Sequence, residues 1–188
     1  MEVGWVPSRM MVREAIRMMT GKAFSGDTYR DNGEGQFVGN IGELAFQEWC
    51  LTFLHKEELE YIAKDKKFYD FLLCGVKFDV KSKERNMVAP PNYHAMVETR
   101  IRDEDCQYYV FASVKVPELG AKDAEYVQLL GYLNKREFWS LPRDDDGKPD
   151  KFPCHKIMHS RLRPMSELKE NLELYAYRVA FGEVEGAA

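Results

Sequence analysis

The sequence predicts a mixed α/β domain in which helices flank a central sheet. An apolar stripe at helical spacing over residues 39–54 predicts a helix, and an alternating pattern over residues 68–81 predicts a β-hairpin. Two apolar runs of strand length, residues 107–116 and 125–133, predict further buried strands. At 188 residues, one domain with a hydrophobic core is the default expectation.

The N-terminal part, residues 1–36, is expected to hold a helix over residues 8–20 and the start of a Gly-rich connector over residues 25–40. Arginines recur at four-residue steps on that helix, which is typical of a solvated face: Arg9, Arg13 and Arg17. The connector is not a phosphate-binding loop, because no Gly-Lys-Ser/Thr follows it and no strand precedes it.

The central part, residues 37–140, begins with the helix over residues 39–54. Its apolar stripe consists of Ala45, Phe46, Trp49, Cys50 and Phe53. Glu43 falls in the first turn, next to Gly42, where another backbone can approach closely. An acid in that position complements the helix dipole, so Glu43 alone does not indicate a site.

The hairpin is expected to turn at Cys74-Gly75, because glycine accepts a positive φ. Its register is then Leu73 with Val76, Phe71 with Phe78, and Asp70 with Asp79. Strand alternation predicts one apolar face made of Tyr69, Phe71, Leu73, Val76, Phe78 and Val80. The opposite face carries Asp70, Lys77, Asp79 and Lys81.

Asp70 and Asp79 are the most informative pair in the sequence. Carboxylates directly opposite each other on neighbouring strands repel, and a divalent cation between them would offset that repulsion. Lys81, two residues along the same face, would then point at whatever the cation binds. A second interpretation stays open: the polar face meets water and Lys81 neutralises the acids, because antiparallel sheets often have one wet face.

The sequence resembles the PD-(D/E)XK, or restriction-endonuclease-like, nucleases in the order of three features. These are a helix bearing Glu43, an Asp on one strand (Asp70) and Asp79-Val80-Lys81 on the next strand. The resemblance covers roughly residues 37–140, and Tyr69 stands where the family name has Pro. It implies a restriction-endonuclease-like core, with a mixed central sheet flanked by helices. It also implies metal-dependent hydrolysis of phosphodiester bonds, with DNA as the expected substrate.

The resemblance assigns a role to each residue. Asp70 and Asp79 hold Mg²⁺, Glu43 completes the site and the Val80 carbonyl contributes an oxygen. Mn²⁺ is expected to substitute, because hard oxygen ligands suit both ions. Lys81 stabilises charge on the phosphorane or orients the attacking water. Many enzymes of this kind dimerise, so a homodimer is an expected assembly.

The net charge of −4 and the pI near 5.7 are unusual for a nucleic-acid-binding protein. Phosphates respond to local patches rather than to overall charge, however. Lys83 and Arg85 continue the hairpin strand, and Arg161 and Arg163 form a second cluster. These four residues are the predicted nucleic-acid contacts.

Several other classes of protein are not indicated. The four cysteines are scattered without a C-x-x-C pair, which predicts reduced core residues rather than a zinc knuckle: Cys50, Cys74, Cys106 and Cys154. No dinucleotide fingerprint appears, so no nucleotide cofactor is expected. No apolar run has the length of a bilayer span and no signal-peptide pattern is present, so a cytoplasmic protein without membrane contact is expected.

The C-terminal part, residues 141–188, is expected to contain a loop over residues 142–153, a helix near 165–172 and a strand near 175–181. His155 and His159 are four apart but lack the Glu of a zinc-protease helix, which favours surface or phosphate contact. Two rival functions stay open. One is a non-catalytic nucleic-acid-binding or assembly protein on the same fold, and the other is a junction-resolving or RNA-cleaving enzyme with the same core.

Overall fold

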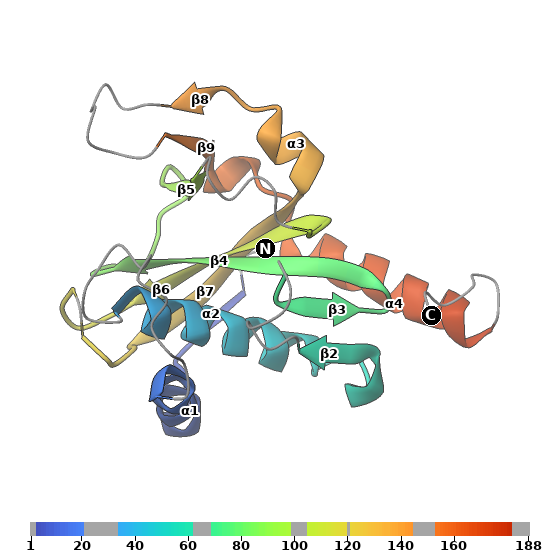
Figure 1. Cartoon of the computed structure of the whole chain (residues 1–188), viewed down its shortest axis with the longest axis horizontal. Coiled ribbons are helices and arrows are strands. Elements are labelled where there is room, and N and C mark those ends of the chain that lie inside the picture. Colours follow the sequence, from blue (N-terminus) through green and yellow to red (C-terminus); the bar gives the residue numbers. More distant parts are fainter. Residues whose placement is uncertain are drawn as a thin grey trace.

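The computed structural model describes residues 3–20, 34–61, 69–98, 105–119, 121–144 and 153–181. In this part of the chain, a six-stranded mixed sheet is flanked by helices and a three-stranded sheet lies beside it (Figure 1). The mixed α/β class predicted from the sequence is confirmed. Within the described ranges, no helix combines the length and the apolar character needed to cross a bilayer.

The large sheet has the order β1 (Val3–Trp5), β7 (Tyr126–Asn134), β6 (Tyr108–Lys115), β4 (Val76–Arg85), β3 (Phe71–Leu73) and β2 (Leu59–Tyr61). Strands β4 and β6 are parallel, and the other neighbours are antiparallel. The small antiparallel sheet has the order β5 (His94–Glu98), β9 (Cys154–Met158) and β8 (Arg143–Asp144).

Four helices accompany these strands in the described segments: α1 (Arg9–Thr20), α2 (Glu34–Cys50), α3 (Lys135–Trp139) and α4 (Met165–Ala180). Figure 1 shows α1 and α2 below the large sheet, with α3 and the small sheet above it. Short 3₁₀ turns occupy Lys56–Glu58 and His159–Arg161. The large sheet is therefore covered on both faces, as its apolar strand sequences require.

Helix α2 packs on the apolar face of the hairpin, as predicted. The ring of Phe46 lies 5.3 Å from that of Phe71 and 5.9 Å from that of Phe78. One turn earlier, Gly42 lies against β4 so closely that a Cβ there would come 1.9 Å from Oγ of Ser82. Only glycine allows this approach, so Gly42 sets how closely α2 lies on the sheet.

The opposite face of the sheet holds a second cluster of buried side chains. Tyr109, Phe111 and Leu130 extend from the large sheet toward Phe138 of α3 and Ile157 of β9. All residues of β6 except the first and the last are buried. This follows from the arrangement, because a strand that is covered on both faces has no side exposed to water.

Two sequence predictions about the elements are wrong, and one strand was missed. Helix α2 begins at Glu34 rather than at residue 39, because Phe37, Val38 and Ile41 continue the buried stripe; residues 34–40 are therefore not a connector, while 25–33 lie outside the described residues. Strand β1 was not predicted. The strand expected over residues 175–181 is the continuation of α4, because Met165, Leu168 and Leu172 are buried at helical spacing and no breaker interrupts the turns that follow.

Candidate active site

The hairpin predicted from the sequence is present as β3 and β4. Phe71 pairs with Phe78 and Leu73 with Val76, as expected. Cys74 and Gly75 form the turn with φ angles of 50° and 82°. Two consecutive positive φ values are typical of the tight turn that joins antiparallel strands.

The predicted direct pairing of Asp70 with Asp79 is wrong, because Asp70 precedes the first paired residue of β3. Its N–H donates to the Phe78 carbonyl at 2.9 Å, although Phe78 already pairs with Phe71. Two residues on one strand thus face one on the other, as in a β-bulge. The carboxylate of Asp70 turns to β4, where its Oδ2 accepts a 2.8 Å hydrogen bond from the Val80 N–H.

The bulge also changes the face on which Tyr69 lies. The sequence placed Tyr69 on the apolar face with Phe71, but it belongs to the cluster on the opposite side of the sheet. Its ring lies 5.2 Å from Nζ of Lys77. Strict alternation holds only inside a regular ladder, and it fails here where the ladder ends.

Asp79 and Lys81 project from β4 on the face away from α2, as their alternation with Phe78 and Val80 predicts. Asp79 is buried, and Nζ of Lys81 lies 2.5 Å from its Oδ2. This ion pair compensates the charge of the buried carboxylate. The ammonium also lies 5.7 Å from the centre of the Tyr109 ring, on β6.

Glu43 is carried by α2, which packs on the other face of β4. Its neighbours on α2 define its level: Gly42 contacts Ser82, and Phe46 contacts Phe78. The side chain of Glu43 is only 2% exposed. Burial of a carboxylate is costly unless the charge is compensated, so a buried acid at this level indicates a specific environment.

The arrangement offers oxygen ligands on both sides of Val80. Because the N–H and C=O of one strand residue point the same way, the Val80 carbonyl faces the edge that Asp70 occupies. Carboxylate and carbonyl oxygens suit a hard divalent cation. Among the described residues, however, no three His, Cys, Asp or Glu side chains are grouped closely enough to form a metal site.

Two of the four predicted nucleic-acid contacts lie together beside this site. Lys83 and Arg85 line a cavity of about 390 Å³ that also reaches Lys81 and His159. Arg163 does not join them, because its guanidinium pairs with Glu137 at 3.2 Å. It also lies 3.6 Å from Glu167, and Arg161 is exposed to solvent.

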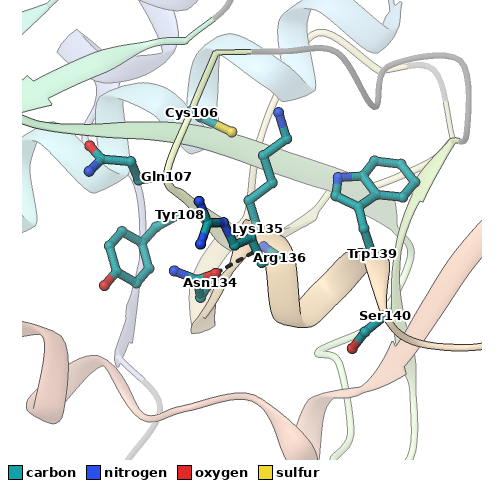
Figure 2. Close-up of a pocket in the computed structure, with 8 residues that line it drawn as sticks. All are labelled: Cys106, Gln107, Tyr108, Asn134, Lys135, Arg136, Trp139 and Ser140. Carbon is teal, nitrogen blue, oxygen red and sulfur yellow. Dashed lines mark hydrogen bonds between the residues drawn. The ribbon is translucent and has the colours of Figure 1, made fainter.

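Sequence reasoning also missed a larger basic and aromatic cavity of about 820 Å³, which Figure 2 shows. Lys135 and Arg136 extend from the start of α3, whose first turn is capped by Oδ1 of Asn134 accepting from the Arg136 N–H at 2.9 Å. Trp139 lines the same cavity and donates from Nε1 to the Tyr109 hydroxyl at 3.2 Å. Tyr109 therefore connects this cavity to Lys81.

The two histidines, for which the sequence favoured surface or phosphate contact, are buried. Nδ1 of His155 donates to the Leu141 carbonyl at 2.8 Å, which gives this side chain a structural role. His159 is 4% exposed, and neither ring nitrogen makes a well-aligned hydrogen bond to the described residues. The sequence contained no signal for this, because the burial depends on β5 folding over the segment.

Comparison with models of protein families, with curated proteins and with solved structures finds no match to this chain.

Proposed function

We propose that this protein is a metal-dependent nuclease that hydrolyses phosphodiester bonds, with DNA as its substrate, on a restriction-endonuclease-like core. The observation that carries the proposal is the hydrogen bond from the Val80 N–H to Oδ2 of Asp70. It ties an acid at the start of one strand to the centre of Asp79-Val80-Lys81 on the next. Helix α2 adds Glu43 at the same level, so helix, first strand and second strand follow in the order of the PD-(D/E)XK pattern.

Asp70, Asp79 and the Val80 carbonyl would hold the cation, with Glu43 extending the site. When bound, Mg²⁺ or Mn²⁺ supplies a Lewis acid that acidifies water and neutralises charge on the phosphate. Binding of a cation would require the carboxylates to reorient, because they are not grouped among the described residues of this structure.

Lys81 has two tasks in this proposal. Without a cation its ammonium compensates the buried Asp79 at 2.5 Å. With cation and substrate present, the ammonium turns from the carboxylate to the phosphate and stabilises the negative charge that develops there. Its position over the Tyr109 ring keeps it close to the site in both states.

The local charge supports a polyanionic substrate in spite of the net charge of −4. Lys83 and Arg85 lie on the same strand as Lys81, and Lys135 and Arg136 line the cavity on the other side of Tyr109. Trp139 adds an aromatic surface of the kind on which unpaired bases stack.

The test is a cleavage assay on linear, circular and single-stranded DNA and on RNA, with Mg²⁺, Mn²⁺ or EDTA. We expect metal-dependent cleavage, reduced at least about 100-fold in Asp79→Asn. Lys169→Gln on α4 is the matched control, because it removes a charge from an exposed ion pair with Glu173. Undiminished cleavage by Asp79→Asn would refute the proposal, and binding without cleavage of any substrate would favour the non-catalytic alternative.

A further inference from the structure

The cavity beside Lys81 has a distinctive lining. Three cationic side chains of β4 alternate along one face of the strand: Lys81, Lys83 and Arg85. Side chains two residues apart on a strand are separated by about 6.7 Å, so the three charges form a row rather than a single point. Glu98 of β5 is the one acid among the described residues that line this cavity.

Lys83 and Arg85 contact side chains and backbone of the β5 region. Nζ of Lys83 lies 3.7 Å from Sδ of Met96, a weak acceptor. Nη2 of Arg85 donates to the His94 carbonyl at 3.2 Å, and its guanidinium stacks 4.4 Å from the Tyr93 ring. Nε of Arg85 is nevertheless buried without a hydrogen-bond partner among the described residues.

His159 forms part of the inner wall of the same cavity. It is 96% buried, since only 4% of its surface is exposed, and neither of its ring nitrogens makes a well-aligned hydrogen bond in the described structure. Burial lowers its pKa to about 4, helped by the charges of Arg85, His94 and Lys83 and opposed by a poorly aligned contact with the Pro90 backbone. A buried group left without aligned partners destabilises the protein, so its presence calls for an explanation.

We propose that this cavity is a phosphate-binding pocket in which Lys83, Arg85 and His159 hold a phosphate group of the nucleic-acid strand next to the one at Lys81. The inference deepens the proposed nuclease function and depends on it for the nature of the ligand. A phosphate oxygen gives Nε of Arg85 the acceptor that it lacks among the described residues, and it can accept a well-aligned hydrogen bond from an N–H of His159. It also brings negative charge to a lining that holds three cationic side chains and one acid.

The direction of the cationic row along β4 determines which phosphate of the nucleic acid enters the cavity. Lys81 is shared between the acidic site and the cavity, so a phosphate held by Lys83 and Arg85 lies further along β4 from Asp79. Ala95, Val97 and Leu130 form an apolar wall there. Such a wall suits the end of a strand, although an internal phosphate on the rim provides the same contacts.

Binding can be measured without catalysis. Fluorescence anisotropy in EDTA would compare single-stranded oligodeoxynucleotides of equal length with a 5′-phosphate, a 3′-phosphate or no terminal phosphate. For the wild type we expect one terminally phosphorylated form to bind about 10-fold more tightly than the unphosphorylated one. Lys83→Gln and His159→Leu should remove that preference, whereas Lys169→Gln should keep it.

The outcomes separate two sources of the phosphate. If all three oligonucleotides bind equally and Lys83→Gln weakens each about 10-fold, the pocket holds an internal phosphodiester and the proposal stands. If neither Lys83→Gln nor His159→Leu changes the binding of any oligonucleotide relative to Lys169→Gln, the proposal is overturned.

Thermal unfolding distinguishes a ligand-binding role for His159 from a structural one. We expect His159→Leu to unfold at the same temperature as the wild type or higher, because it removes an unsatisfied buried imidazole. A lower unfolding temperature together with unchanged binding would contradict the proposal. Lys83→Gln, at a partly exposed side chain, keeps the test decisive if His159→Leu does not fold.

The pocket and the nuclease activity fail independently. Asp79→Asn should retain the oligonucleotide preference in EDTA while losing cleavage with Mg²⁺. If the wild type shows the binding effects of the pocket but cleaves no substrate, the pocket proposal stands and the nuclease proposal is refuted. If the wild type cleaves DNA but the pocket variants do not change binding, the nuclease proposal stands and the pocket proposal is refuted.

Discussion

The backbone N–H of Val80 donates to Oδ2 of Asp70 at 2.8 Å. Val80 lies beyond the residues of β4 that pair with β3, so on this edge its N–H bonds to a side chain and not to the backbone of a neighbouring strand. This bond turns the carboxylate of Asp70 toward the strand that carries Asp79 and Lys81. The bond uses one of the two carboxylate oxygens of Asp70. Structure and proposed chemistry therefore depend on the same side chain in different ways.

Substitutions at Asp70 should separate these two roles. Asn retains an acceptor for the Val80 N–H but lacks the negative charge, so Asp70→Asn is expected to fold normally and to bind Mg²⁺ more weakly. Ala loses the hydrogen bond as well and should lower the free energy of unfolding by about 1–3 kcal/mol. Thermal unfolding and calorimetric titration with Mg²⁺ measure the two effects. Equal Mg²⁺ affinity in Asp70→Asn and the wild type would exclude Asp70 as a ligand.

In the proposed site, Lys81 and a cation would compete for the same oxygen of Asp79. The ammonium lies 2.5 Å from Oδ2, so its removal in Lys81→Gln should strengthen Mg²⁺ binding in the absence of substrate. Cleavage should fall about 100-fold, because the amide cannot stabilise charge on the phosphate. Titration of the metal and cleavage rates at saturating metal give the two readouts. A loss of metal affinity in this variant would show that Lys81 organises the site instead.

The contact between Gly42 and Ser82 is expected to control the position of Glu43. A Cβ at residue 42 would come 1.9 Å from Oγ of Ser82 and 3.3 Å from Cβ of Ala112. Gly42→Ala should therefore displace α2 and lower the free energy of unfolding by about 1–3 kcal/mol. Adding Ser82→Gly should restore part of this loss, which chemical denaturation of the single and double variants can measure. Strictly additive effects would contradict a direct clash.

Acid should destabilise the protein through His159. The unfolded chain takes up a proton near the ordinary pKa of about 6.5, whereas the folded protein keeps this imidazole neutral down to about pH 4. Stability is therefore fully present above pH 6.5 and falls as the pH drops toward 4, on the order of 2 kcal/mol after allowance for partial hydration. The charged or titratable side chains near the ring are those of Arg85, Lys83, His94 and Glu98. A variant that changes only His159 keeps all four of them.

The variant His159→Leu provides the measurement for this pH dependence. Denaturation between pH 4 and 7 should show a shallower loss of stability than in the wild type, because the depressed histidine is gone. Parallel curves for the two proteins would mean that His159 does not titrate differently in the folded and unfolded states.

The parts of the fold that depend on neighbouring residues could be predicted from the sequence. The turn at Cys74-Gly75 and the register of β3 with β4 follow from a positive φ and strict alternation. The strands β6 and β7 follow from two apolar runs of strand length. The α2 side of the hairpin, with Phe46 on Phe71 and Phe78, follows from the matching of two apolar faces.

The parts that were wrong depend on choices made outside the local sequence. Residues 175–181 alternate like a strand, yet they extend a helix that is already anchored at Leu168 and Leu172. In the sequence, Tyr69 continues the alternation of the hairpin, but the bulge at Asp70 puts its side chain on the opposite face of the sheet. Each case has two nearly equivalent local solutions, and packing against distant residues selects one of them.

The sequence by itself determined which chemical groups are available on β4: Asp79, Lys81, Lys83 and Arg85 on one face, with Val80 between the first two. Only the tertiary structure decided that Asp70 bonds to Val80, that α2 brings Glu43 alongside, and that His159 closes a cavity over the cationic row. The physical reason is that alternation and turns are set by covalent neighbours. Contacts between segments tens of residues apart arise only when the whole core packs.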